Sequence, residues 1–146
     1  MCSSDLSPVY RPNLLPNSSN NPIEGASAGC TGITAGSKLG NPDLYFDPCV
    51  FADQTDRRFF GNLGRHTVSG PGLVNLDLSV IKNTRVAERI TLQFRSELFN
   101  ILNHPNFNNP AAAIFARSGA VTANRGRINT TNTTSREIQF GLKLLF

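Results

Sequence analysis

The stretch Arg136-Glu137-Ile138-Gln139-Phe140-Gly141-Leu142-Lys143-Leu144-Leu145-Phe146 decides the fold, because apolar and polar side chains alternate along it. Ile138, Phe140, Leu142, Leu144 and Phe146 share one parity, and Leu145 is the single apolar residue on the other. Successive side chains of a β-strand point to opposite faces, so the pattern predicts a strand with one apolar face and one polar face. The run has the roughly 9–11 residues that a tilted membrane-spanning strand needs.

This C-terminal pattern resembles the closing strand of a bacterial outer-membrane β-barrel, in which the apolar alternation ends on an aromatic residue. The resemblance implies that Phe140, Leu142, Leu144 and Phe146 form the signature that the barrel-assembly machinery recognises. An edge strand of a soluble β-sandwich has the same period, so this stretch alone leaves both folds open.

Two further segments show the same alternation, in residues 73–85 and 89–101. The short connection 86–89 between them predicts a hairpin. A helix over 89–102 is the alternative, because Ile90, Phe94 and Leu98 also satisfy helical spacing. Leu92 would lie off that helical face, and the period of two recurs in all three segments, so we favour strands.

One long irregular segment precedes the three predicted strands, and another lies between the second strand and the third. Residues 7–71 contain frequent prolines and turn signals without sustained periodicity, and residues 103–135 form a second irregular loop. A short strand or 3₁₀ turn suits the residues around 44–46 or 50–51, and 111–116 suits one helical turn. Sixty irregular residues are too many for a connection inside a compact soluble domain, but outer loops of membrane barrels are long.

We therefore predict an all-β fold in which residues 72–146 form the last three antiparallel strands of a transmembrane β-barrel. Residues 7–71 form a long extracellular loop region. If the closing strand ends on the periplasmic side, both long connections fall outside and only the turn 86–89 falls inside. That asymmetry is typical of outer-membrane barrels.

Composition agrees with this prediction. The 146 residues are 39% hydrophobic and only 16% charged, which is low for a soluble domain. The net charge of +4 comes from scattered basic residues, so no nucleic-acid partner is expected. Residues 1–6 match the translation of a common sequencing-adapter end, and we treat them as an assembly artefact. On that view the chain is the tail of a longer protein.

Cys30 and Cys49 lie in a stretch rich in Gly, Pro and Asn, without a His or Cys at metal-ligand spacing. Two cysteines in such a loop predict a disulfide in an oxidising compartment. The alternative is a pair of free thiols in a cytosolic loop.

The polar parity of the strands carries the candidate lumen-facing residues, which are Asp77, Gln93, Arg95, Glu97, Glu137 and Lys143. Glu97 and Glu137 are candidates for a catalytic pair of carboxylates. Charge interactions with Arg95 and Lys143 in the barrel lumen explain these two residues better. His66 and His104 have no partner at a ligand spacing and are interpreted as loop residues. We therefore expect no catalytic residue, no metal or cofactor site and no enzyme activity.

A series of short motifs carries a family resemblance. In order they are Gly61-Asn62-Leu63-Gly64-Arg65, Gly70-Pro71-Gly72-Leu73, Asn75-Leu76-Asp77-Leu78-Ser79, Lys82-Asn83-Thr84, Leu92-Gln93-Phe94-Arg95, Glu97-Leu98-Phe99-Asn100 and Asn103-His104-Pro105-Asn106-Phe107. Together with Arg11-Pro12-Asn13-Leu14 and Tyr45-Phe46-Asp47-Pro48, they resemble the C-terminal end of Oar-like TonB-dependent outer-membrane receptors, many of which carry a carboxypeptidase-regulatory-like domain.

The resemblance implies a barrel of about twenty-two strands with an N-terminal plug. It implies the bacterial outer membrane as location, and outer-membrane lipid, the barrel-assembly machinery and the TonB complex as partners. The implied function is substrate uptake, with this segment forming barrel wall and external loops. The alternatives are a soluble or surface-attached all-β adhesin and, less favoured, a small enzyme on a β scaffold.

Overall fold

The computed structural model describes residues 11–56 and 59–146, so the segment that we attribute to a sequencing adapter lies outside the described residues. The chain divides into two units. We call Gly72–Asn106 with Thr131–Phe146 the strand unit, and Met1–Pro71 with Phe107–Thr130 the loop unit. Within the described ranges, no helix is long and apolar enough to cross a membrane.

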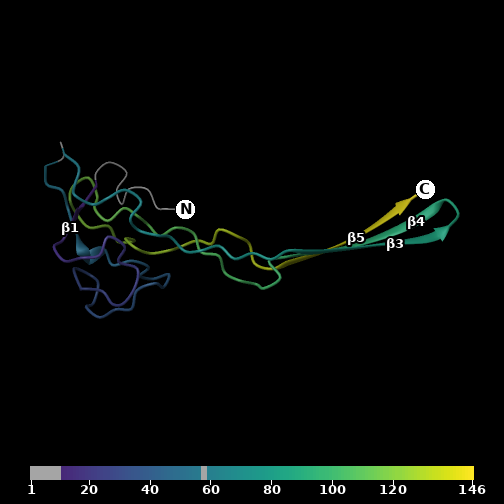
Figure 1. Cartoon of the computed structure of the whole chain (residues 1–146), viewed down its shortest axis with the longest axis horizontal. Helices are drawn as coiled ribbons and strands as arrows, with labels where there is room; N and C mark the ends of the chain where they lie inside the picture. Colours follow the sequence, from purple (N-terminus) through teal and green to yellow (C-terminus); the bar gives the residue numbers. More distant parts are fainter. Residues whose placement is uncertain (1–10, 57–58) are drawn as a thin grey trace. The chain divides into compact units, whose positions relative to one another are not determined.

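The strand unit is a three-stranded antiparallel sheet in the order β3-β4-β5. β3 covers Leu78–Ala87, β4 covers Ile90–Phe99 and β5 covers Glu137–Leu145. Figure 1 shows these three strands as long arrows in green and yellow. The sheet confirms the predicted all-β class, and the helix considered for 89–102 is absent from this described segment.

The hairpin turn is shorter than predicted. We expected a connection over 86–89, but β3 continues to Ala87 and leaves only Glu88 and Arg89 in the turn. The strand register shifts between Arg85 and Ala87, as in a β-bulge. After this shift Ala87 still pairs with Ile90, so β3 extends closer to the turn. The other two predicted strands, 89–101 and 136–146, differ from the observed bounds by one or two residues.

The start of the first predicted strand was also wrong, because β3 begins at Leu78 and not at residue 73. The backbone of Val74 bonds to a side chain instead of a strand: Val74 N–H donates to Asn106 Oδ1 at 2.8 Å, and Asn106 Nδ2 donates to the Val74 carbonyl at 2.9 Å. Asn106 Nδ2 also donates to Thr133 Oγ1 at 2.9 Å. A side-chain amide thus replaces the ladder in this segment.

A second buried asparagine holds the same end of the sheet. Asn100 ends β4 with φ of 47°, and its N–H donates to an Asp77 carboxylate oxygen at 2.9 Å. Asn100 Nδ2 donates to the carbonyls of His104 and Thr134, both at 3.1 Å. Asn100 and Asn106 are the two buried residues of the strand unit, and together they tie its three chain segments to one another.

The loop unit contains little regular structure. β1, Asn13–Leu14, pairs with β2, Phe51–Ala52, and the 3₁₀ helix η1, Pro48–Val50, leads into β2. The 3₁₀ turn and strand suggested around 50–51 are confirmed. The helical turn suggested for 111–116 is wrong, because Ala111, Ala116 and Ile114 instead bond to residues 120–127 across an extended loop.

A small core organises the loop unit. It consists of Phe46, Phe51, Leu63, Val68 and Ile114, with the rings of Phe46 and Phe51 in edge contact at 6.2 Å. Gly61 lets one segment approach another closely, because a Cβ there would lie 2.2 Å from the Pro12 carbonyl oxygen. The motif containing Gly61 therefore allows its backbone to pack against the backbone of Pro12.

Replacing Asn106 tests whether its side chain holds the end of the sheet. Asn106→Ala removes the bonds to Val74 and Thr133 and the contact with His104 at a fully buried site, and we expect a local cost of about 1–3 kcal/mol. Amide exchange at Val74 should accelerate about 10–100-fold, measured by hydrogen–deuterium exchange in detergent. Asn129→Ala, at an exposed loop position, is the control. Equal exchange at Val74 in both variants would show that Asn106 does not hold this end.

Candidate functional site

One face of the strand unit is apolar along most of its length. The strand register places directly opposed residues on the same face. The residues of this apolar face are Leu78, Val80, Lys82 and Thr84 from β3, Leu92, Phe94, Ser96 and Leu98 from β4, and Ile138, Phe140, Leu142 and Leu144 from β5. The rings of Phe94 and Phe140 stack at 6.1 Å across two strands.

Nothing in the described residues of the strand unit covers the apolar face. The side chains of Phe140 and Leu142 are about 72% and 70% exposed, and every residue of β3 and β5 is exposed. A contiguous apolar surface of this kind is rare on a soluble monomer and marks contact with a partner or a membrane. The predicted assembly residues Leu142, Leu144 and Phe140 belong to it. Phe146 follows β5 and is 98% exposed.

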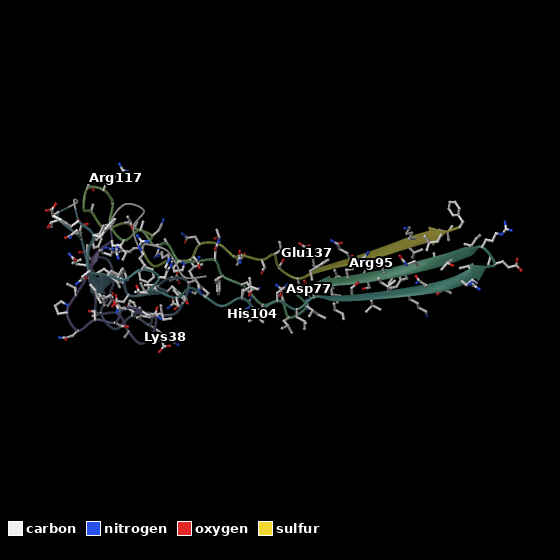
Figure 2. The ribbon with its side chains drawn as sticks, turned by 45° about the horizontal axis from the view of Figure 1, so that its top comes forward. Lys38, Asp77, Arg95, His104, Arg117 and Glu137 are labelled. Carbon is white, nitrogen blue, oxygen red and sulfur yellow. A yellow bond between two sulfur atoms is a disulfide. The ribbon has the colours of Figure 1, made fainter. Side chains whose placement is uncertain are left out.

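The opposite face is polar. Gln93, Arg95 and Glu97 lie on it from β4, opposed by Lys143, Gly141 and Gln139 of β5. Arg95 Nη2 lies 2.6 Å from Glu97 Oε1, which makes an ion pair. Figure 2 labels Arg95 on the sheet. Gln93 Nε2 donates to Asn83 Oδ1 at 2.9 Å. Exposed pairs of this kind contribute about 0–1 kcal/mol, so they shape the charge of the face more than its stability.

Three residues of β3 break the alternation, one of them Thr84 on the apolar face. Lys82 lies on the apolar face opposite Phe94, and Ile81 lies on the polar face opposite Arg95. A long lysine side chain can extend its ammonium away from an apolar surface while its methylene groups remain in contact with it. The exception therefore does not destroy the apolar character of the face.

The structure brings only some of the predicted lumen-facing residues together. Arg95 pairs with Glu97 and Lys143 lies opposite Gln93, whereas Glu137 lies opposite Phe99. Asp77 precedes β3, and its carboxylate accepts from the Asn100 N–H and from Asn75 Nδ2. Figure 2 shows Asp77 and Glu137 near the same end of the sheet, with Arg95 farther along it. Asp77 is thus a residue of the asparagine network.

Cys30 and Cys49 form a disulfide in the loop unit, with their sulfur atoms 2.08 Å apart and their Cα atoms 5.4 Å apart. Asp47 organises the surrounding chain. Its carboxylate accepts from Ser27 Oγ at 2.9 Å, from the Ala28 N–H at 2.6 Å and from the Cys49 N–H at 3.0 Å. The three bonds fix the segments that carry both cysteines, so the bridge and the Asp47 carboxylate hold the same segments.

The two histidines lie in loops. His66 has a φ of 54°, and His104 Nδ1 lies 3.3 Å from Asn106 Oδ1. Residues 11–56 and 59–146 contain no group of three potential metal ligands. Burial raises the pKa of the Tyr45 phenol, whose ring packs against the core of the loop unit.

The roles of Asn100 and Asn106 were not predicted from the sequence, which placed Asn100 in the strand 89–101 and Asn106 in the loop 103–135. For Asn100 the available signal was its place directly after an apolar alternation, where backbone groups need new partners. A cavity of about 500 Å³ in the loop unit was not predicted either, because its lining comes from segments more than eighty residues apart, such as those carrying Lys38 and Arg125.

Comparison with known proteins agrees with the two-faced sheet. The sequence matches the family described as "Outer membrane beta barrel domain" over residues 4–139. That range includes β3, β4 and the first residues of β5. No curated protein and no solved structure gives a significant match to the chain.

Breaking the disulfide should weaken the loop unit selectively. The bridge joins residues 19 apart, and closing a loop of this size stabilises by about 3 kcal/mol in the loop-entropy model. We expect Cys30→Ser to lower the unfolding free energy of the loop unit by that amount, measured by amide exchange at Ala28 and Leu39. Cys2→Ser is the control. Maleimide labelling of Cys30 and Cys49 before reduction would contradict the bridge.

Proposed function

The chain belongs to the outer membrane β-barrel domain family, and from this premise we propose that it forms the last three strands of a TonB-dependent receptor of the Oar-like kind. Its location is the bacterial outer membrane, where it forms part of a barrel wall. The observation that carries the proposal is the combination of a two-faced sheet with two long connections that leave it at one end.

The strands have the length that a barrel wall requires. Each contains 9 or 10 residues, and a strand of ten residues rises about 33 Å. With the tilt of about 45° common in barrels, that rise spans about 23 Å, close to the apolar band of about 25 Å. The apolar face then contacts lipid, and the polar face with Arg95 and Glu97 faces the barrel interior.

The sheet needs further strands. β3 and β5 each have a neighbour on one side only, because β4 separates them. An unpaired strand edge is not viable in lipid, where no water can bond its N–H and C=O groups. Closure into a barrel supplies the missing partners, and known single-chain bacterial barrels have at least eight strands. We propose that the rest of a barrel of about twenty-two strands supplies them here.

Chain connectivity supports the proposed orientation. β3 begins, β4 ends and β5 begins at the same end of the sheet, where the asparagine network lies. The opposite end carries the two-residue turn and Phe146. Outer-membrane barrels have short periplasmic turns and long extracellular loops, which would put the loop unit outside the cell.

The finer assignment rests on the series of motifs described for the Oar-like receptors. In this proposal the barrel-assembly machinery recognises Phe140, Leu142, Leu144 and Phe146, and a plug and TonB-contact segment lie elsewhere in the full-length receptor. The chain itself performs no covalent chemistry. The exposed apolar face favours this membrane role over the soluble adhesin.

Neighbouring residues of β5 should report opposite environments. In the full-length receptor, a spin label at Leu142→Cys should collide mainly with oxygen, which dissolves in lipid. A label at Lys143→Cys should collide mainly with a water-soluble nickel chelate. Power-saturation electron paramagnetic resonance measures both, with Cys30 and Cys49 held in their disulfide. Equal accessibility profiles at 142 and 143 would reject the assignment of the two faces.

Loss of Phe146 should impair assembly and leave transport intact. It follows β5 at the periplasmic end, where an aromatic side chain suits the membrane interface. In the full-length receptor we expect Phe146→Ala to lower outer-membrane abundance severalfold, with nearly unchanged uptake per molecule. Lys143→Ala, on the polar face, is the matched control and should keep normal abundance.

Both quantities can be measured in the same cells. Immunoblots of outer membranes give abundance, and mass spectrometry of compounds depleted from the medium gives uptake. Uptake should vanish in cells that lack TonB. Normal abundance of Phe146→Ala would remove the assembly role, and uptake that persists without TonB would refute the receptor assignment.

A further inference from the structure

The loop unit contains a cavity of about 500 Å³ between the segments around residues 32–44 and 123–127. This volume lies within the range of about 300–1,000 Å³ that small-molecule sites occupy. Unlike most such sites, its lining is mainly polar and includes Lys38, Arg125 and Arg127 as cations and Asp43 as the single acid.

Arg125 is the central cation of the cavity. It is buried, with only 8% of its surface exposed. One guanidinium nitrogen donates to the Thr122 carbonyl at 2.6 Å, and another donates to the Thr31 carbonyl. These bonds join two distant segments and fix the direction of the guanidinium. The partners are neutral carbonyls, so they orient the charge without cancelling it.

The loop that carries Lys38 is also fixed. Asn41 Nδ2 donates to the Lys38 carbonyl at 2.6 Å, and Asn41 Oδ1 accepts from the N–H groups of Asp43 and Leu44 at 3.0 Å. Ser37 Oγ donates to the Thr34 carbonyl at 2.8 Å. The backbone of the rim is therefore held in place before any ligand arrives, which lowers the entropic cost of binding.

The charge of the cavity is unbalanced. Three cations and one carboxylate give the lining a net charge of +2. Within the residues that the structure describes, no ion pair joins Asp43 to Lys38, Arg125 or Arg127. A buried charge is normally paired, because desolvating it is costly. A concave site lined by one sign of charge concentrates ions of the opposite sign.

We propose that this cavity binds an anionic small molecule through carboxylate or phosphate oxygens. Guanidinium groups match these oxygens with two parallel hydrogen bonds, and Lys38 adds a mobile point charge at the rim. The further assignment of this cavity as the capture site for the transported substrate rests on the proposed function. Binding itself can be measured without transport, so the two can fail separately.

The test is calorimetric titration of the full chain in a nonionic detergent at low salt. The probes are D-glucuronate and inorganic phosphate, with neutral D-glucose as the comparison. We expect at least one anionic probe to bind and D-glucose not to bind. Binding of the carboxylate alone or of phosphate alone identifies the preferred oxygen group. Failure of both anions, or equal binding of D-glucose, overturns the proposal.

Variants separate the cavity from general surface charge. Arg127→Gln and Lys38→Gln change exposed side chains and should each weaken binding about tenfold, the loss expected for one charge-assisted contact. Arg117→Gln removes the same charge from an exposed turn of the loop unit that does not line the cavity, and Figure 2 shows Arg117 well apart from Lys38. An equal loss in Arg117→Gln overturns the proposal.

Transport distinguishes the two hypotheses. If the anion binds but the full-length receptor takes up nothing in a TonB-dependent manner, the proposed function fails and the binding site stands. If uptake depends on TonB but no anion binds the cavity, the site fails and the receptor assignment stands.

Discussion

The uncovered apolar face of β3, β4 and β5 is the constraint on which the rest of the molecule depends. A soluble sheet buries such a face against a second layer, yet the only buried residues of the strand unit are the polar Asn100 and Asn106. The hydrophobic effect therefore contributes little inside this unit, and a lipid solvent must take the place of a core. In that solvent each backbone group needs a partner, so the three strands also require neighbours at both edges.

The loop unit follows the opposite rule, because it holds its own apolar core. Phe46, Phe51 and Ile114 pack there, but the core is too small to fix a long irregular chain by burial alone. Covalent and polar links supply the remainder. The bridge between Cys30 and Cys49 closes one segment, and Asp47 bonds the chain around it. The chain thus combines one unit stabilised by lipid contact with another stabilised by cross-links.

The sequence predicted the sheet because a period of two is a direct consequence of strand geometry. It placed β4 and β5 to within two residues, and it identified Cys30 and Cys49 from their setting. It could not place the start of β3, since the alternation continues through Val74 while a side-chain amide has already replaced the strand partner. It could not find the cavity around Arg125 either, because no local pattern records contacts across ninety residues.

The asparagine network explains why the strands end where they do. Side chains can replace a strand ladder only where water satisfies the remaining polar groups, because an unmet N–H or C=O in hydrocarbon costs several kcal/mol. Beyond Phe99 the chain turns at Asn100 with a positive φ, and Asn103 and His104 are exposed. This segment therefore cannot lie in the lipid band. The buried amides of Asn100 and Asn106 mark one limit of the membrane-spanning sheet, and they hold its three segments together at the point where lipid contact ceases to do so.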